Sequence, residues 1–375
     1  MSVVSNSSLQ NIIDHSKNQL GFHTKGLEKL NDFELVKRHR IDAIFPIEYL
    51  EEFTTDEFKR KVEKRRVKMT VKALKMLKTL NQFKQILEIE NIEFLLLKGI
   101  PLKYLLFKNS EKRISRDIDA LVKPMDVKTV FQLLKRKGFH LSTPLIEFKE
   151  EQWPLFLKEF DQVSFFHKET RVSIEIHWKL FRNESYFPVE ESTLWKNRKT
   201  FNVGNVEFQS LSTPIHAVYI SLHGAQHQWD SLVWIMDMYF LHNIMTNEEK
   251  EQSVLVAKKY NVLETYVLGY LMAKMIFELK VDSMFEIHFS KKVQKMASAS
   301  IQFLERNSST AGSKIGVVKR MLYLLKLQPS YIGKLHHFYN FPIYSMKHQS
   351  SRRKFVHWSL RPITQIKEKR FKNKN

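Results

Sequence analysis

The sequence predicts an α+β protein in which a small mixed sheet with flanking helices precedes a mostly helical region. Three observations support this fold class. A short apolar run at 94–97 and an alternating segment at 114–122 read as strands, and the stretch beginning at Pro101 between them suits a helix. A second alternating segment at 171–180 predicts another half-buried strand. Between 211 and 306, apolar stripes at helical spacing replace the strand patterns.

The composition limits the classes of protein that fit. The chain has 375 residues, 43% of them hydrophobic, which is enough for one large or two ordinary domains. It contains no cysteine, which excludes disulfides, thiol catalysis and cysteine-ligated zinc and is compatible with a reducing compartment. No apolar run approaches the length of a membrane span, and the first residues do not follow a secretory signal pattern. A cytoplasmic location without a transmembrane segment is therefore expected.

The formal charge is strongly positive, at +21 from 61 basic and 40 acidic residues. Such a surplus favours anionic partners such as nucleotides, nucleic acid or an anionic membrane surface, although a lysine-rich solubilising surface gives the same count. The last stretch, 351–375, holds nine basic residues against Glu368 and is rich in aromatic residues. It could bind nucleic acid or an anionic surface, or pack as a last helix on the body.

Changes in pattern along the chain predict four parts. Residues 1–54 form a polar lead that is partly disordered or helical, 55–210 the catalytic domain, 211–306 a helical domain that completes the cleft, and 307–375 a basic, aromatic-rich segment. A long helix is predicted from Thr55 to Glu90, packed across the sheet. Its apolar stripe comprises Val67, Val71, Leu74, Leu77, Leu80, Phe83 and Leu87.

Two carboxylates lie close together on the strand predicted at 114–122. Ile118, Ala120 and Val122 would face one side, so Asp117 and Asp119 project side by side on the other. They repel each other unless a positive charge lies between them, and Mg²⁺ is the usual partner of such oxygens. A pair of solvated carboxylates at a strand end is the simpler alternative.

A glycine turn precedes this strand. Lys98-Gly99 closes the apolar run at 94–97, and Pro101 follows in the first turn of the expected helix. Glycine permits close approach of backbone N–H groups to a ligand, and a helix N-terminus favours an anion. The pattern therefore predicts a phosphate-binding turn beside the metal site.

Glu175 is a candidate third acid. It alternates with Ile174 and Ile176 on the strand predicted at 171–180, which can pair as a hairpin with a strand at 163–167. If this strand also lies beside that of Asp117, the acids can together bind two metal ions for displacement at phosphorus.

The order LLLKG, then R-x-x-x-DID-x-LV, then IEIHW resembles the bacterial nucleotidyltransferase family within the DNA polymerase β-type superfamily. The segment 211–241 is similar to the helical part of that family, and a weaker similarity lies at 358–362. The resemblance, over roughly 60–245, implies a polymerase β-like core with Mg²⁺, or alternatively Mn²⁺, bound by Asp117, Asp119 and Glu175. It also places Lys98 and Gly99 at the nucleotide phosphates. The superfamily usually has Gly-Ser at this turn, so Lys98-Gly99 is a departure that offers no hydroxyl there.

Other side chains are candidates for the cleft. Arg113 could neutralise charge on the departing pyrophosphate, and His177 shares the face of Glu175. His223 and His227 lie at i and i+4 of a helix expected to begin at 212–214, so they share one face. Asp237 and Asp230 fall near the same stripe if that helix continues through Trp229. The histidines could face the cleft or form a buried structural pair, and a zinc site is a third reading.

These features predict a metal-dependent nucleotidyltransferase. It would transfer an NMP from an NTP to an acceptor hydroxyl or phosphate and release pyrophosphate. The acceptor could be a small molecule, a sugar, a protein or an RNA. The alternatives are an enzyme directed to RNA, such as a tRNA end, and a catalytically inert nucleotide-binding module with the same fold.

Overall fold

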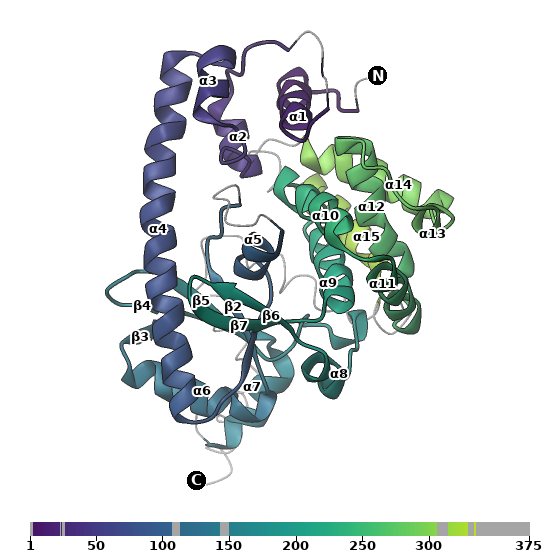
Figure 1. The fold of residues 1–375 in the computed structure, drawn as a ribbon. Coiled ribbons are helices and arrows are strands. Elements are labelled where there is room, and N and C mark those ends of the chain that lie inside the picture. The colour runs from purple at the N-terminus through teal and green to yellow at the C-terminus, as the bar shows by residue number, and fades with distance from the viewer. Residues whose placement is uncertain are drawn as a thin grey trace.

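The computed structural model describes residues 3–22, 24, 27–106, 113–142, 150–305, 314–328 and 334. In these residues a single mixed sheet occupies one half of the molecule, and helices surround it and form the other half (Figure 1). The predicted fold class, a mixed sheet with flanking helices followed by a helical region, is confirmed. The basic segment predicted at 351–375 lies outside the described residues.

The sheet has seven strands in the order β3-β4-β5-β2-β1-β7-β6. The predicted hairpin is present as the antiparallel pair β4–β5, and β6 and β7 form a second antiparallel pair. The central strand β2 begins at Ile118, four residues later than predicted. The strands are β1 (Phe94–Leu96), β2 (Ile118–Val122), β3 (Phe139–Leu141), β4 (Gln162–His167), β5 (Ser173–His177), β6 (Lys199–Val203) and β7 (Val206–Ser210).

The two faces of the sheet belong to different cores. Ile118, Ala120 and Val122 pack in a core with Leu80 and Phe83 of the long helix, as the alternating pattern predicts. That core also receives side chains of the helices α4 (Asp56–Ile89), α6 (Val127–Arg136) and α7 (Trp153–Glu159). Leu121 instead joins the larger core formed with the helical region. Asp119 therefore projects from the face that is covered by helices far along the chain.

The helical region packs on this second face. It comprises α9 (Thr213–Gln226), α10 (Leu232–Ile244), α11 (Asn247–Lys259), α12 (Leu263–Phe277), α13 (Ser283–Glu286), α14 (Lys291–Leu304) and α15 (Lys314–Leu327). The expectation that the first of these helices continues through Trp229 is wrong. Gln228 and Trp229 both have positive φ and form a turn, and the fully buried Trp229 ring covers Gly224, where a Cβ would lie only 2.5 Å from it.

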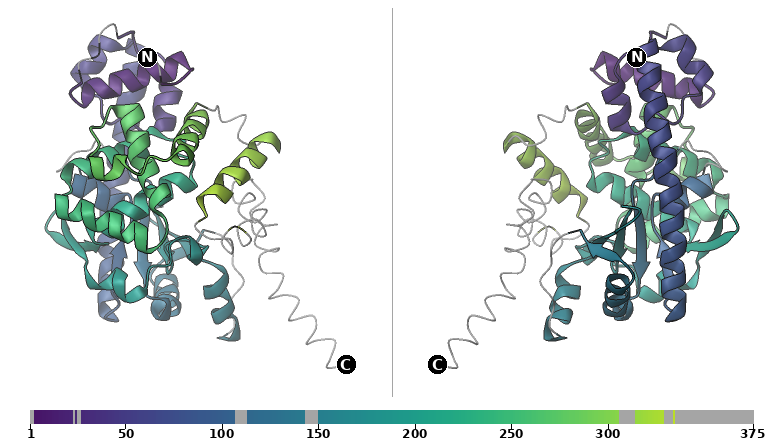
Figure 2. Two further views of the ribbon diagram at one scale, coloured as in Figure 1. Left: turned by 90° about the vertical axis from the view of Figure 1, so that its right-hand side faces the viewer. Right: turned by 90° about the vertical axis from the view of Figure 1, so that its left-hand side faces the viewer.

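The N-terminal residues form three helices, α1 (Ser7–Gln19), α2 (Phe33–His39) and α3 (Ile47–Phe53). They lie between the upper part of α4 and the helical region (Figures 1 and 2). Leu9, Ile12 and Val36 are buried in the same core as the helical region, so these helices hold α4 and the helical region together. The remaining helices are α5 (Ile100–Leu106) and α8 (Glu191–Lys196), with single 3₁₀ turns at Pro124–Asp126, Glu150–Gln152 and Glu184–Tyr186.

The long helix α4 has the predicted length, but part of its predicted apolar stripe is wrong. Val67, Val71 and Leu74 are 66%, 48% and 62% exposed, whereas Leu80 and Phe83 are fully buried. The sheet packs against the C-terminal half of α4, whereas the N-terminal half contacts α2 and α3 and buries Phe58 and Val62 instead. Three- and four-residue steps allow more than one apolar line along a helix of this length, so spacing alone did not select the buried residues of its first half. Among the described residues, no helix combines the length and apolar character needed to cross a membrane.

We expect His39 to make the fold sensitive to acid. Its ring is fully buried, Nδ1 accepts a hydrogen bond from the Leu232 N–H, and burial with the neighbouring Arg38 and Arg40 lowers its pKa to about 3. Below pH 6.5 the unfolded chain binds a proton at this residue and the folded chain does not. The free energy of unfolding therefore falls by about 1.4 kcal/mol per pH unit through this residue as the pH decreases from 6.5 towards 3.

Chemical denaturation of the wild type and of His39→Asn at pH 7, 6 and 5 checks this expectation. Asparagine keeps an acceptor near the position of Nδ1 but does not titrate. The free energy of unfolding of the variant should therefore fall less steeply between pH 6 and 5, by about 1.4 kcal/mol per pH unit. The same slope in both proteins would contradict it.

Candidate active site

Strand pairing brings the predicted acids together. β2 and β5 run parallel, and Asp119 is directly paired with Glu175. Side chains two residues apart on a strand share a face, so His177 lies on the same side as Glu175. The parallel pairing of β5 with β2, on which the prediction of a third acid depended, thus places Glu175 beside the acidic strand.

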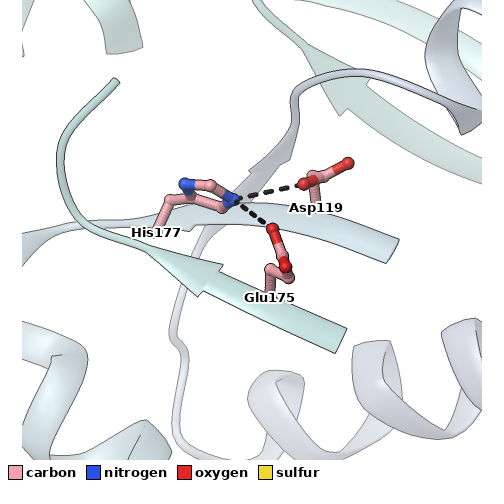
Figure 3. A group of neighbouring side chains, drawn as sticks. All are labelled: Asp119, Glu175 and His177. Atoms are coloured by element: carbon pink, nitrogen blue, oxygen red, sulfur yellow. Dashed lines mark hydrogen bonds and ion pairs between the residues drawn. The ribbon is translucent and has the colours of Figure 1, made fainter. Parts of the chain in front are cut away.

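The three side chains converge on one point (Figure 3). The His177 ring nitrogen Nε2 lies 3.2 Å from Asp119 Oδ1 and 3.7 Å from Glu175 Oε2. One ligand atom from each of the three residues can be chosen so that all lie within 4.8 Å of one another. Burial lowers the pKa of His177, but its interactions with Asp119 and Glu175 outweigh this and raise the pKa above its usual value. The carboxylates of Asp119 and Glu175 therefore favour a proton or another cation at this point.

Lys98 provides a cation at this point. Its ammonium group lies 2.8 Å from Asp119 Oδ1, and its side chain is 18% exposed. Burial lowers the pKa of Lys98, but Asp119, Glu175 and Asp117 together raise it above its usual value, so the side chain stays charged. Gly99, the next residue, has φ +55°, which is the left-handed conformation that favours glycine. The predicted turn therefore lies directly against the acids.

Asp117 lies beside this group at intermediate exposure. Burial and the negative charge of Asp119 raise the pKa of Asp117 to about 6. Lys72 of α4 and Arg116 are near it: burial and Arg116 lower the pKa of Lys72, whereas Asp117 raises it. Lys72 and Arg116 were not singled out from the sequence, because both lie in stretches where lysine and arginine are common and only the fold brings them to Asp117.

Arg113 and Asp237 form a buried ion pair. Arg113 donates from Nε and Nη2 to the two Asp237 carboxylate oxygens at 2.6 and 2.8 Å, and from Nη1 to the Gly99 carbonyl at 2.9 Å. Their side chains are 7% and 1% exposed. Arg113 therefore links the Gly99 turn to helix α10. Contact between Arg113 and pyrophosphate stays a prediction, and the structure places Asp237 on Arg113 rather than at the acids.

The two predicted histidines of α9 lie close together, with ring centroids 4.6 Å apart. His227 also contacts the Trp234 ring, and the guanidinium group of Arg40 lies over the same ring, with its Cζ 4.9 Å from the centroid. Burial and the charge of Lys98 lower the pKa of His223 well below its usual value, so this ring is neutral beside the Lys98 ammonium. His223 thus lies near Lys98, whereas Arg40 reaches Trp234 from the N-terminal part that was predicted to be a lead.

The donor set fits a divalent cation. Two carboxylates and an imidazole converge, and burial together with the charge of Asp119 raises the pKa of a third carboxylate, Asp117. Hard divalent ions take carboxylate oxygens, and a histidine nitrogen suits Mn²⁺ and related ions as well. The arrangement can therefore hold a metal ion next to a cationic turn suited to phosphate.

The comparisons with known proteins agree with this geometry. A family model described as an uncharacterised nucleotidyltransferase matches residues 22–278, more than half of the chain, and covers all of the acids and the Lys98-Gly99 turn. No curated protein matches the chain. With the mixed sheet and the convergent acids in place, the chain belongs to this family of uncharacterised nucleotidyltransferases.

Proposed function

We propose that the protein is a metal-dependent nucleotidyltransferase that transfers an NMP from an NTP to an acceptor hydroxyl or phosphate. The observation that carries this proposal is the convergence of Asp119, Glu175 and His177 within 4.8 Å, beside the Lys98-Gly99 turn. A structural pair of carboxylates needs neither a third acid nor a buried lysine in contact with it. The proposal also keeps the division of the chain predicted from the sequence, with the catalytic domain at 55–210 and the helical domain that completes the cleft at 211–306.

Each residue then has a role. Asp117, Asp119 and Glu175 would hold the divalent cation, Mg²⁺ or alternatively Mn²⁺, which when bound supplies positive charge to the phosphates and acidifies the acceptor hydroxyl. His177 holds Asp119 and Glu175 towards a common point. Lys98 and the backbone at Gly99 bind phosphate oxygens, and Arg113 fixes that turn through the Gly99 carbonyl.

The reaction balances without a further reactant. A bond forms between the acceptor oxygen and the α-phosphorus, and the bond between the α-phosphorus and its bridging oxygen to the β-phosphorus breaks. Pyrophosphate leaves with the electron pair, and Glu175 takes the acceptor proton. Lys98, Lys72 and Arg116 offset the charge that develops on the phosphates, so catalysis rests on position and electrostatics.

Transfer of label from nucleotides tests the proposal. The protein is incubated with Mg²⁺ or Mn²⁺, each α-labelled NTP in turn, and the small-molecule, RNA and protein fractions of a cell extract. We expect label in one fraction with the wild type and none with Asp117→Asn/Asp119→Asn. With the same NTP labelled at the γ-phosphate, the acceptor should carry no more label with the wild type than with the double variant, because the γ-phosphate departs in pyrophosphate. Absence of both transfer and metal-dependent nucleotide binding would overturn the proposal.

The Gly99 turn gives a second expectation. In Gly99→Ala the alanine would have to adopt a positive φ, and its Cβ would lie 3.2 Å from Ser115 Oγ. We expect a loss of about 1–2 kcal/mol in the free energy of unfolding and at least tenfold weaker nucleotide binding, because the phosphate-binding backbone must shift.

Gly138→Ala is the matched control for this variant. Gly138 also has positive φ, at +83°, but its Cβ would have open space around it. It should lose a similar amount of stability with unchanged nucleotide binding, as measured by denaturation and calorimetry. Equal nucleotide affinities in the two variants would show that the Gly99 backbone does not bind the nucleotide.

A further inference from the structure

A pocket of about 330 Å³ lies beside the Gly99 turn, with Ile100 and Ser115 in its lining. The segment 43–46, helix α4, helix α5 and the segment 113–115 form its walls. Most of its lining is apolar, from Ile44, Phe45, Met69, Ala73, Met76 and Ile100. Its volume lies at the lower end of the range for pockets that bind small organic molecules, about 300–1,000 Å³.

The pocket is connected to the proposed active site by three features. Arg113 lines it and donates to the Gly99 carbonyl at 2.9 Å. Ser115 lines it two residues before Asp117. Lys72, whose pKa responds to Asp117, lies one residue before the lining residue Ala73 on α4. A molecule in the pocket would therefore lie beside the metal-binding acids and the phosphate turn.

Ser115 supplies a polar group that lacks a partner. Its Oγ is buried and forms no hydrogen bond within the described part of the chain. It lies against the Gly99 turn, 3.2 Å from where a Cβ on Gly99 would be. A buried hydroxyl without a partner is destabilising, so a ligand that offers a hydrogen bond there gains from satisfying it. By contrast, Arg66 at the pocket wall already donates to the Asp42 and Phe45 carbonyls.

We propose that this pocket binds the acceptor, and that the acceptor is a small molecule with an apolar body that carries a hydroxyl. The inference rests on the proposed nucleotidyl transfer and names its second substrate. The apolar body fills the space between α4 and α5, and Ser115 orients the hydroxyl end towards Asp117 and Glu175. The acceptor oxygen then attacks the α-phosphorus as described above.

The lining decides between acceptor classes. A sugar presents hydroxyls on every side and needs polar partners for each, whereas the walls here are mostly methyl, methylene and aromatic groups. An RNA or a folded protein needs a far larger contact area than a 330 Å³ pocket provides. A compact, mostly apolar body that carries a hydroxyl matches the volume and the lining, in which polar side chains such as Thr70, Lys103 and Ser115 stand among apolar ones.

Binding of 2-naphthol tests the proposal, with naphthalene and glucose as comparisons. Calorimetry or ligand-observed NMR should show that the wild type binds 2-naphthol more tightly than naphthalene and does not bind glucose at the same concentration. Ala73→Phe, which fills the pocket, should weaken 2-naphthol binding at least tenfold. Val71→Phe places the same ring on the exposed face of α4, where Val71 is 48% exposed, and should leave binding unchanged.

A second variant tests the hydroxyl contact without filling the pocket. Ser115→Ala removes only the hydroxyl, so it should abolish the preference for 2-naphthol over naphthalene and leave naphthalene binding intact. Addition of Mn²⁺ with a non-transferable α,β-methylene NTP should enhance the relaxation of bound 2-naphthol protons, because the pocket adjoins the acids. Asp119→Asn should lose that enhancement.

The outcomes separate this inference from the proposed function. Ala73→Phe should bind the α,β-methylene NTP within threefold of the wild type, as measured by calorimetry. If it loses the nucleotide instead, the pocket holds the nucleobase and the acceptor assignment is overturned. Equal binding of 2-naphthol by wild type and Ala73→Phe also overturns it. If the wild type binds no α,β-methylene NTP with any of the four bases, the proposed function fails. Loss of 2-naphthol binding in Ala73→Phe alone would then show a ligand site without an acceptor role.

Discussion

Asp119→Asn should reduce nucleotidyl transfer by at least ~10³-fold, equivalent to about 4 kcal/mol of transition-state stabilisation. Asp119 is the residue on which the site converges: Lys98 lies 2.8 Å and His177 3.2 Å from the same oxygen, Oδ1. Asparagine has nearly the same shape but carries no charge, so it cannot compensate a metal ion together with Glu175. Single-turnover transfer and calorimetric titration with Mn²⁺ should both show the loss.

The control for this variant must separate chemistry from folding. Asp119→Asn leaves Lys98 and His177 partly buried with one fewer negative charge, so some loss of stability is expected. Thermal denaturation should show that the variant remains folded at the assay temperature. Glu207→Gln removes a carboxylate from an exposed position of β7 and should leave transfer and metal binding unchanged. If Asp119→Asn retained Mn²⁺ binding and more than a tenth of the activity, Asp119 would not be a metal ligand.

The alternation of apolar and polar residues predicted the site residues that lie on or next to neighbouring strands. Asp119 and Glu175 could be proposed as neighbours from the sequence because alternation fixed the face of each strand. That β5 lies beside β2 was only a condition of this prediction, and the parallel pairing of the two strands meets it. The glycine turn was predictable for the same reason, since Gly99 stands between a strand and a helix and has the expected positive φ.

Features that depend on distant packing were not predictable. Arg40 comes from the N-terminal helices and reaches Trp234 on α10, which no local pattern in the lead indicates. The first half of α4 packs against α2 and α3 rather than the sheet, and the predicted stripe misassigned Val67 and Val71 to the buried side. The pocket beside Ser115 also needs four separate segments, and its existence follows only from how they meet.

Breaking the Arg113–Asp237 pair should cause the largest loss of stability. The two residues are 124 positions apart and form two charge-assisted hydrogen bonds with side chains 7% and 1% exposed. Removing one partner leaves the other charge buried without compensation, which typically costs about 3–5 kcal/mol. We expect this loss in both Arg113→Met and Asp237→Leu, measured by chemical denaturation at neutral pH.

The double variant tests whether the loss comes from the unpaired charge. Arg113→Met/Asp237→Leu replaces the pair by apolar groups, so it should be more stable than the sum of the single losses predicts, by at least about 2 kcal/mol. Lys292→Met removes one partner of an exposed ion pair with Glu264, whose side chains are 52% and 47% exposed, and should cost at most about 1 kcal/mol. Additive single losses would show that the charges do not act as a pair.

The same variants connect stability to the site. Arg113 also donates to the Gly99 carbonyl, whereas Asp237 has no such contact with the turn. The double variant should therefore recover stability but keep weaker nucleotide binding than the wild type, because the Gly99 carbonyl has lost its donor. Recovery of nucleotide affinity together with stability would mean that Arg113 serves only to hold helix α10 to the sheet. A stable protein with an impaired phosphate turn would instead show that the ion pair fixes Arg113 so that Arg113 can fix Gly99.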